Sequence, residues 1–145
     1  MLKIDRSARS QVQASPARCL DLLGAVERYP EWASLIGSAQ VVEGEPSRVR
    51  LRAELMGVGL EMDCALERGT DRVALRRIAH GPDDDERYHA TWTLTPAGPD
   101  LTGVELHVTA ALDAPGPAGL LRGRIERKLV DDLLADFERE IRNYG

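Results

Sequence analysis

The stretch SRVRLRAELMGVGLEMDCALERGTDRVALRR, from Ser47 to Arg77, decides the fold. Apolar and charged residues alternate in it, from Val49 to Leu55 and again from Leu60 to Leu66. A period of two is typical of strands that bury one face of a sheet and expose the other. The segments MGVG and RGTD separate these runs and contain residues that turns favour. The pattern therefore predicts an antiparallel meander with one apolar face.

Turn length and charge together predict a strand register for this meander. A four-residue loop at Met56–Gly59 would pair Leu55 with Leu60 and would set Arg52 opposite Asp63. Opposite charges on neighbouring strands contribute about 0.2–1 kcal/mol per pair. One register thus aligns the apolar face and the ion pairs at the same time.

The same register extends through a second four-residue loop, at Arg68–Asp71, which pairs Leu66 with Val73. It adds three ion pairs on the outer face: Arg48 with Glu67, Arg72 with Glu67 and Arg76 with Asp63. Its one misfit sets two like charges, Glu54 and Glu61, opposite each other. The row Arg48, Arg50 and Arg52 is interpreted as a solvated sheet face, and the alternative is a site for a polyanion.

Alternation continues on both sides of this stretch. Further strands are expected from Val73, from Tyr88 to Leu94 and from Val104 to Ala110, with loops at HGPDDDE and PAGPD between them. Residues 4–12 alternate more loosely and predict a first strand. The segment SAQVVE begins another strand just before the meander.

Two short helices are expected between the first and second strands. Ser15 is a favourable N-cap and Pro16 suits the first helical position, so a helix is predicted to run to about Glu27. After Pro30 a second helical turn is expected, which ends at Gly37. This turn carries three large apolar residues, Trp32, Leu35 and Ile36.

The chain becomes helical after the turn predicted at DAPGPAG, residues 113–119. One apolar residue recurs every four positions: Leu121, Ile125, Leu129, Leu133, Phe137 and Ile141. A helix of about 24 residues would be about 36 Å long, which is enough to cross a small sheet. The natural packing buries the apolar stripe of this helix against a curved sheet of about seven strands, an α+β fold.

Composition limits the function. The 145 residues carry 19 basic and 24 acidic side chains, for a net charge of −5, which argues against nucleic acid as the main partner. The N-terminus lacks the apolar core of a signal peptide and no long apolar run exists, so a single cytoplasmic domain over residues 1–145 is expected, without a transmembrane segment. Cys19 and Cys64 lie in apolar patterns and are expected to be buried thiols. No spacing of histidine and cysteine predicts a metal site.

The segment VERYPEWA, which follows ASPARCLDLLGA, carries a resemblance to a known family. Together with the element order it resembles the START-like (SRPBCC) superfamily, and most of all its polyketide cyclase/dehydrase-like and coenzyme-Q-binding-like members. Glu27, Tyr29, Pro30 and Trp32 match the turn that follows the first helix in that superfamily.

The resemblance implies a helix-grip fold with a cavity between the sheet and the long C-terminal helix. It implies that the protein binds or carries a hydrophobic small molecule, such as a lipid, an isoprenoid quinone or a polyketide, with no cofactor. Two alternatives stay open: a cyclase, aromatase or dehydratase that acts on a poly-β-ketone, and a protein-interaction module whose cavity is closed. Either a monomer or a homodimer is compatible with the sequence.

Arg77 has the parity of the apolar face, which raises the question of its partner. The predicted register places it opposite Met62 and beside Ala90. Because a buried arginine stays charged, it needs a partner. Either a bulge near Arg76 returns Arg77 to solvent and turns Ile78 inward, or Arg77 points into the cavity and binds an oxygen anion of a ligand.

Three residues are candidates for catalysis: Arg77, Tyr88 and His80. Tyr88 and Trp92 share the inward parity, so they either fill the core or contact a ligand, and the Tyr88 hydroxyl is able to bond a ligand carbonyl. His89 and His107 have the outward parity, and the run Asp83–Asp85 is expected to be solvated. The predicted ligand-binding set is Trp32, Leu35, Ile36, Leu51, Met62, Arg77, Tyr88, Trp92, Leu106, Leu121, Ile125 and Leu129. Residues 32, 35 and 36 are interpreted as a cover of the cavity or as ordinary core that plugs the end of the sheet, and the two roles are not exclusive.

Overall fold

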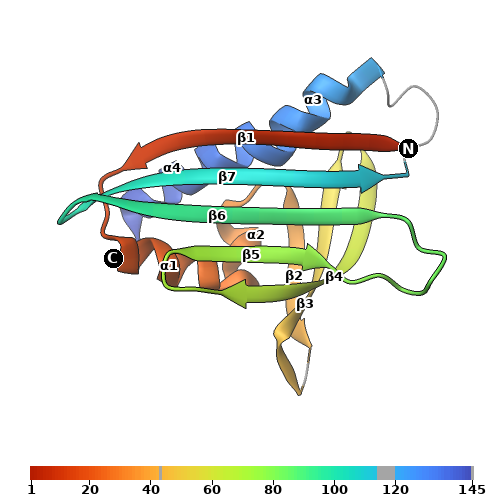
Figure 1. Ribbon diagram of the computed structural model, residues 1–145, viewed down its shortest axis with the longest axis horizontal. Helices are drawn as coiled ribbons and strands as arrows, with labels where there is room; N and C mark the ends of the chain where they lie inside the picture. The colour runs from red at the N-terminus through yellow and green to blue at the C-terminus, as the bar shows by residue number, and fades with distance from the viewer. Residues whose placement is uncertain (43, 114–119, 145) are drawn as a thin grey trace.

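A seven-stranded antiparallel sheet curls around a C-terminal helix (Figure 1). The computed structural model describes residues 1–42, 44–113 and 120–144. The strand order in the sheet is β1-β7-β6-β5-β4-β3-β2. The strands are β1 (Leu2–Val12), β2 (Ile36–Val42), β3 (Glu45–Leu55), β4 (Val58–Arg68), β5 (Arg72–Arg77), β6 (Arg87–Gly98) and β7 (Leu101–Leu112). The predicted α+β helix-grip fold is confirmed.

Short helices connect β1 to β2, as predicted. They are α1 (Pro16–Gly24), the 3₁₀ turn η1 (Val26–Arg28) and α2 (Tyr29–Trp32). The Ser15 side chain caps α1 and accepts a hydrogen bond from the Arg18 backbone N–H at 3.3 Å. The second helix ends earlier than expected, because Ile36 already pairs with Ala53 of β3.

The C-terminal helix consists of α3 (Arg122–Glu126), a π-helical segment η3 (Arg127–Asp132) and α4 (Leu133–Asn143). The Arg6 guanidinium of β1 donates two hydrogen bonds to the Asp131 carboxylate, at 2.9 and 2.7 Å. These bonds hold η3 beside the edge strand of the sheet. The hydrogen bond from Arg6 also holds the pKa of Asp131 below its usual value. The turn predicted at residues 113–119 lies almost wholly outside the described residues.

The predicted register of the central hairpins is wrong. Leu55 pairs with Val58, so the loop between β3 and β4 has two residues, not four. Both of them, Met56 and Gly57, have positive φ angles, +54° and +82°, as the preferred two-residue hairpin turns require. Leu66 likewise pairs with Leu75 and not with Val73.

The corrected register moves every outer-face pair by two residues. Arg50, and not Arg52, lies opposite Asp63 and donates to it at 3.0 Å, while Arg52 lies opposite Glu61. The expected clash between two glutamates is absent, since Glu54 lies opposite Gly59. The arginine row does face outward, as predicted, and two of its members, Arg48 and Arg50, bond acidic neighbours.

The core lies between the sheet and the helix. The apolar stripe of the helix is buried from Ile125 to Ile141, and Phe137 is fully enclosed. The Phe137 ring packs on Trp92 of β6 at 5.2 Å and on Trp32 of α2 at 6.0 Å. Both cysteines are buried free thiols, as predicted. Within the described residues, no helix combines the length and the apolar character that a membrane span needs.

Candidate functional site: an apolar pocket

A small apolar pocket lies where β2, β3 and β4 meet the C-terminal helix. Its lining consists of apolar side chains and one tyrosine: Leu35, Ile36, Leu51, Ala53, Leu55, Leu60, Met62, Tyr88, Leu112 and Leu129. The cavity has a volume of about 20 Å³. That is room for about one water molecule, and ligand pockets usually measure about 300–1,000 Å³. The pocket is therefore nearly closed in this conformation.

Strand parity explains the chemistry of the pocket wall. Leu51 pairs with Met62, and Ala53 pairs with Leu60, so four side chains of one hairpin point to the inner face together. The helix contributes Leu129 from the π-helical segment η3. Because nothing but apolar carbon and one thioether comes from these elements, the wall offers a ligand surface contact and no charge.

Tyr88 is the polar side chain of the lining. It is buried at the start of β6, with the inward parity that the sequence predicts. Its hydroxyl has no hydrogen-bond partner within the described residues, and burial raises the pKa of its phenol above the ordinary value of 10.0. The phenol is therefore neutral at physiological pH, and its hydroxyl is available to bond an oxygen of a ligand.

Arg77 follows neither of the two accounts that the sequence suggested. It keeps the inward parity, with its Cα paired to Cys64 and not to Met62, so the proposed bulge is wrong. Its side chain is only 7% exposed. It does not line the pocket, because the loop after β5 folds back and supplies its partners. Arg77 donates to the Glu86 backbone carbonyl at 3.0 Å and pairs with the Asp84 carboxylate at 2.8 Å.

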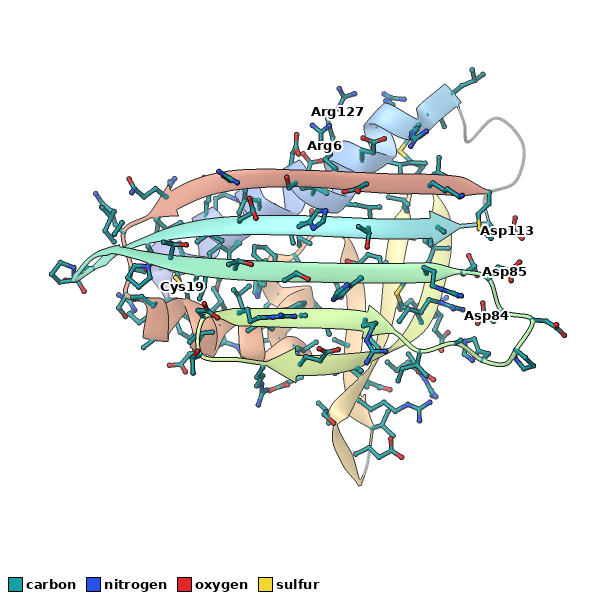
Figure 2. The ribbon with its side chains drawn as sticks, viewed as in Figure 1. Arg6, Cys19, Asp84, Asp85, Asp113 and Arg127 are labelled. Atoms are coloured by element: carbon teal, nitrogen blue, oxygen red, sulfur yellow. The ribbon has the colours of Figure 1, made fainter. Side chains whose placement is uncertain are left out.

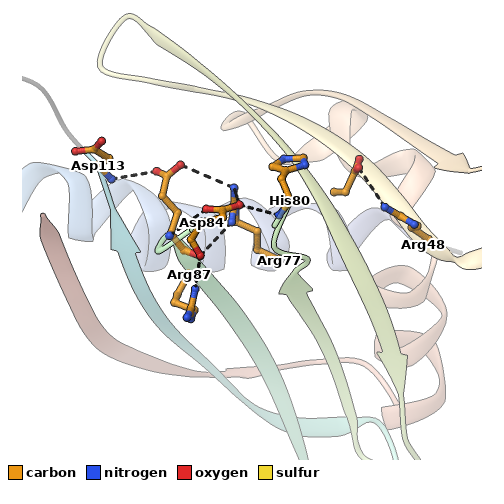
Figure 3. A network of polar contacts seen from close by, with 8 residues as sticks. Arg48, Arg77, His80, Asp84, Arg87 and Asp113 are labelled. Atoms are coloured by element: carbon orange, nitrogen blue, oxygen red, sulfur yellow. Dashed lines mark hydrogen bonds and ion pairs between the residues drawn. The ribbon is translucent and has the colours of Figure 1, made fainter. Parts of the chain in front are cut away.

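The β5–β6 loop holds Asp84 in place for this role (Figure 3). The Asp84 carboxylate accepts hydrogen bonds from the backbone N–H groups of His80 and Glu86, at 2.8 and 3.2 Å. Its hydrogen bond with Arg77, together with these two, holds the pKa of Asp84 well below the ordinary value of 3.8. The expectation that the whole acidic run is solvated is thus wrong for Asp84, whose side chain is 14% exposed, and right for Asp83 and Asp85.

The other titratable candidates lie away from the pocket or are inert. The His80 side chain is exposed, so the structure does not bring it to the pocket together with Tyr88. His89 and His107 lie on the outer face, as predicted, where His107 bonds Asp5 at 2.7 Å. Burial raises the pKa of the Cys64 thiol to about 12, so this thiol stays protonated. Among the described residues, no group of histidine, cysteine and acidic side chains is arranged to hold a metal ion.

The predicted ligand-binding set divides into two groups. Six members line the pocket: Leu35, Ile36, Leu51, Met62, Tyr88 and Leu129. The other six pack elsewhere in or beside the core: Trp32, Arg77, Trp92, Leu106, Leu121 and Ile125. Four lining residues were not predicted, namely Ala53, Leu55, Leu60 and Leu112. Three of them, Ala53, Leu55 and Leu60, share the parity of Leu51 and Met62, and this parity was the sequence signal that could have found them.

Trp32 joins an aromatic cluster with Tyr29, Trp92 and Phe137. Its indole Nε1 is buried and has no hydrogen-bond partner among the described residues. The Tyr29 hydroxyl donates to the Leu23 carbonyl at 2.6 Å and so fixes the turn between α1 and α2. The large apolar residues between the first helix and the second strand are therefore core at one position, Trp32, and pocket wall at two, Leu35 and Ile36.

Ser34, which lies between Trp32 and Leu35, is hydrogen-bonded to the C-terminal helix. Both the backbone N–H and the hydroxyl of Ser34 donate to the Asp136 carboxylate, at 2.9 and 2.8 Å. Arg139 donates to the other oxygen of the same carboxylate. Asp136 is buried, so these bonds satisfy a charge that would otherwise be costly in the interior.

A larger hollow, of about 370 Å³, lies between α1 and the turn that joins β4 to β5. Half of its lining residues are exposed, including Asp21, Glu27 and Arg68. The Arg68 guanidinium is already bonded to the Gly24 carbonyl at 2.5 Å. This hollow lies outside the space between sheet and helix and brings no catalytic group into a protected position.

A family model described as "Polyketide cyclase / dehydrase and lipid transport" matches residues 12–138. The chain belongs to this family. The match covers both the first short helix and nearly all of the C-terminal helix, so the family includes every element that forms the pocket. The resemblance that VERYPEWA suggested is confirmed. No curated protein matches the chain in sequence.

Solved structures share the fold of this family member over nearly its full length. A START superfamily protein from Mycobacterium smegmatis is 18% identical, with a TM-score of 0.79 over 97% of this chain and 99% of that one. A protein from Thermus thermophilus is 26% identical, with a TM-score of 0.77 over 97% and 98%. The Zhui aromatase/cyclase from a Streptomyces species is 16% identical, with a TM-score of 0.71 over 99% and 98%.

Proposed function

We propose that the protein binds a hydrophobic small molecule, such as a lipid, an isoprenoid quinone or a polyketide, between its sheet and its C-terminal helix. The observation that carries this proposal is the pocket wall, which consists of nine apolar side chains and Tyr88, whose hydroxyl has no hydrogen-bond partner among the described residues. The family description, which names lipid transport beside polyketide cyclases, supports the same class of ligand.

The ligand needs more room than the closed pocket offers, so the wall has to move. Met62 lies in the wall and has a flexible side chain that fills different shapes at low cost. Leu60 and Ala53, on the inner face of the same hairpin, are only partly buried. Displacement of these side chains outward would widen the pocket without breaking the hydrogen bonds between β3 and β4.

Two experiments test the binding. Native mass spectrometry of protein purified from its own host should show an added mass that is lost on denaturation, because a carrier retains its ligand. Calorimetric titration with 2-acetylnaphthalene, a flat uncharged ketone, should show one saturable site, because the ketone oxygen accepts a hydrogen bond from Tyr88 while the rings contact the apolar wall.

A pair of variants locates the site. Ala53→Leu adds three carbon atoms to the pocket wall and should weaken 2-acetylnaphthalene binding at least about tenfold, or about 1.4 kcal/mol. Ala65→Leu makes the same change on the outer face of the next strand, opposite Arg48, and should leave the affinity unchanged. Equal affinities in the two variants, each checked for folding by circular dichroism, would place the ligand elsewhere.

Catalysis on a poly-ketone is the second candidate, and Tyr88 is the observation that favours it. A buried, neutral phenol without a partner among the described residues is able to donate a hydrogen bond to a ketone or an enolate. Arg77 supports this candidate less, because Asp84 already neutralises its charge. Conversion of a synthetic poly-ketone that Tyr88→Phe abolishes would establish catalysis. A protein that binds neither this compound nor 2-acetylnaphthalene would instead fit the third possibility, an interaction module with a closed cavity.

A further inference from the structure

The end of the pocket at Tyr88 borders on a charged cluster. Arg76 pairs with His89, so Tyr88 lies beside the end of β5, where Arg77 is located. Arg77 also pairs with Cys64, two residues along β4 from the pocket residue Met62. The guanidinium donates to the Glu86 backbone carbonyl, two residues before Tyr88, so it lies near the end of the pocket that carries this polar side chain.

Acidic side chains of the protein itself already neutralise the charge of the Arg77 guanidinium. Asp84 is 2.8 Å from it and the Glu86 carboxylate is 3.9 Å from it, so the Arg77 charge faces two negative ones. The neighbouring Arg87 guanidinium donates to the backbone carbonyls of Asp84 and Glu86, each at 3.1 Å. Glu86 is held in turn by the Asp113 backbone N–H, at 3.0 Å. Figure 3 shows Arg77, His80, Asp84 and Asp113 in this network. A ligand carboxylate that reached this end of the pocket would thus lose its water and find the Arg77 charge already neutralised.

We propose that Asp84 is a specificity-determining residue, which occupies Arg77 and thereby makes the pocket select uncharged ligands over acidic ones. This inference rests on the proposed binding function and names the ligand class: apolar molecules whose polar group is a ketone, quinone, alcohol or ester. Removal of the Asp84 charge would free the Arg77 guanidinium, which prefers planar carboxylates as partners. The same pocket would then accept apolar acids.

Two matched ligands test the selectivity of the unaltered protein. The ketone 2-acetylnaphthalene and the acid 2-naphthoate have the same ring system and nearly the same shape, and only the acid is charged at about pH 7.5. Calorimetric titration of the wild-type protein should give a dissociation constant at least about ten times lower for the ketone. Equal or tighter binding of naphthoate would overturn this inference and would leave the proposed function standing. Binding of neither compound would overturn both.

Three variants test the role of Asp84 itself. Asp84→Asn, and the double variant Asp84→Asn/Glu86→Gln, should each bind 2-naphthoate at least about tenfold more tightly than wild type, with the ketone affinity unchanged within about twofold. Asp85→Asn makes the same change of net charge one residue further on, at an exposed side chain that Figure 2 shows in the same loop, and should alter neither affinity. A naphthoate gain of the same size in Asp85→Asn, or no gain in the double variant, would refute the assignment.

Discussion

For Arg77, the sequence predicts the inward position but not the partner, Asp84. Strand parity places Arg77 on the apolar face, and the cost of an unpaired buried charge means that a partner is needed. The partner was not predictable by parity, because it comes from a loop whose path depends on three local hydrogen bonds of Asp84 with His80, Glu86 and Gly81. An acidic run in the loop that follows a strand ending in an inward arginine is nevertheless a usable sequence signal.

The Asp84 charge should contribute to stability in a pH-dependent way. Its pKa is lowered in the folded protein, first of all by the hydrogen bond with Arg77, so folding favours the ionised carboxylate. The stability difference between wild type and Asp84→Asn should therefore be constant near neutral pH. It should shrink as the pH falls below the ordinary carboxyl pKa of 3.8 toward the lower pKa of the folded state.

Urea denaturation at several pH values between about 7 and about 3 would measure this difference. Asp85→Asn is the control, since its exposed carboxylate has no hydrogen bond or ion pair among the described residues and should give no pH-dependent difference from wild type. A wild-type advantage over Asp84→Asn that grew as the pH fell would contradict the sign of the effect.

The existence and type of the secondary-structure elements were predictable from the sequence, and the register between neighbouring strands was not. Alternation identified six of the seven strands, because parity is a property of each strand alone, and the segment SAQVVE predicted the other. The pairing of β3 with β4 depends on the turn, and MGVG permits either a two-residue or a four-residue loop. The Glu54–Glu61 clash that the longer loop implied was the signal of the error, since the two-residue turn at Met56 and Gly57 removes it.

Gly57 should therefore be the sensitive position of this hairpin. Its φ is +82°, and a Cβ would meet no atom within 4 Å, so Gly57→Ala tests backbone conformation without steric contact. We expect it to lower the free energy of unfolding by about 1–2 kcal/mol, the cost of a left-handed residue with a side chain. Gly59→Ala, two residues on, also meets open space but has no positive φ and should be neutral or slightly stabilising. Equal losses in thermal denaturation of the two variants would argue against this turn.

The structure explains why the apolar residues of the C-terminal helix repeat every four positions. Its apolar stripe repeats every four residues, and in an α-helix each such step advances by about 40° around the axis. Over the stripe from Leu121 to Ile141 this drift would turn the later residues away from the sheet. The π-helical segment η3 winds more slowly and so compensates the drift in the middle of the helix. In this helix the π-helical segment thus allows a strict repeat of four to stay on the side of the sheet.

At the scale of the whole molecule, one apolar stripe of the C-terminal helix supplies side chains to both the pocket wall and the core. Leu129 lines the pocket and Leu133, one step along the stripe, is buried outside it. Leu129→Ala and Leu133→Ala should each cost about 2–5 kcal/mol of stability. Only Leu129→Ala should also tighten 2-acetylnaphthalene binding, because the atoms it removes open space in the pocket. Urea denaturation with and without the ketone would separate the two effects, and equal ligand stabilisation of both variants would contradict the assigned wall.

The overall architecture was predictable because many weak signals agreed: strand parity, the proline-capped first helix, VERYPEWA and the terminal stripe. The size of the cavity was not, because it depends on how side chains such as Met62 and Leu129 interlock across two elements. A sequence pattern shows which residues face inward, and it does not show how much space remains between them.

The nearly closed pocket has a consequence for kinetics. Since about one water molecule fits in the space of about 20 Å³, a ligand encounters a protein that is not yet able to receive it. Association then waits for side chains of the β3–β4 hairpin to move apart, which lowers the on-rate below that of a preformed site. In a stopped-flow mixing experiment, the observed rate would stop rising at high ligand concentration, and its plateau would report how often the protein opens.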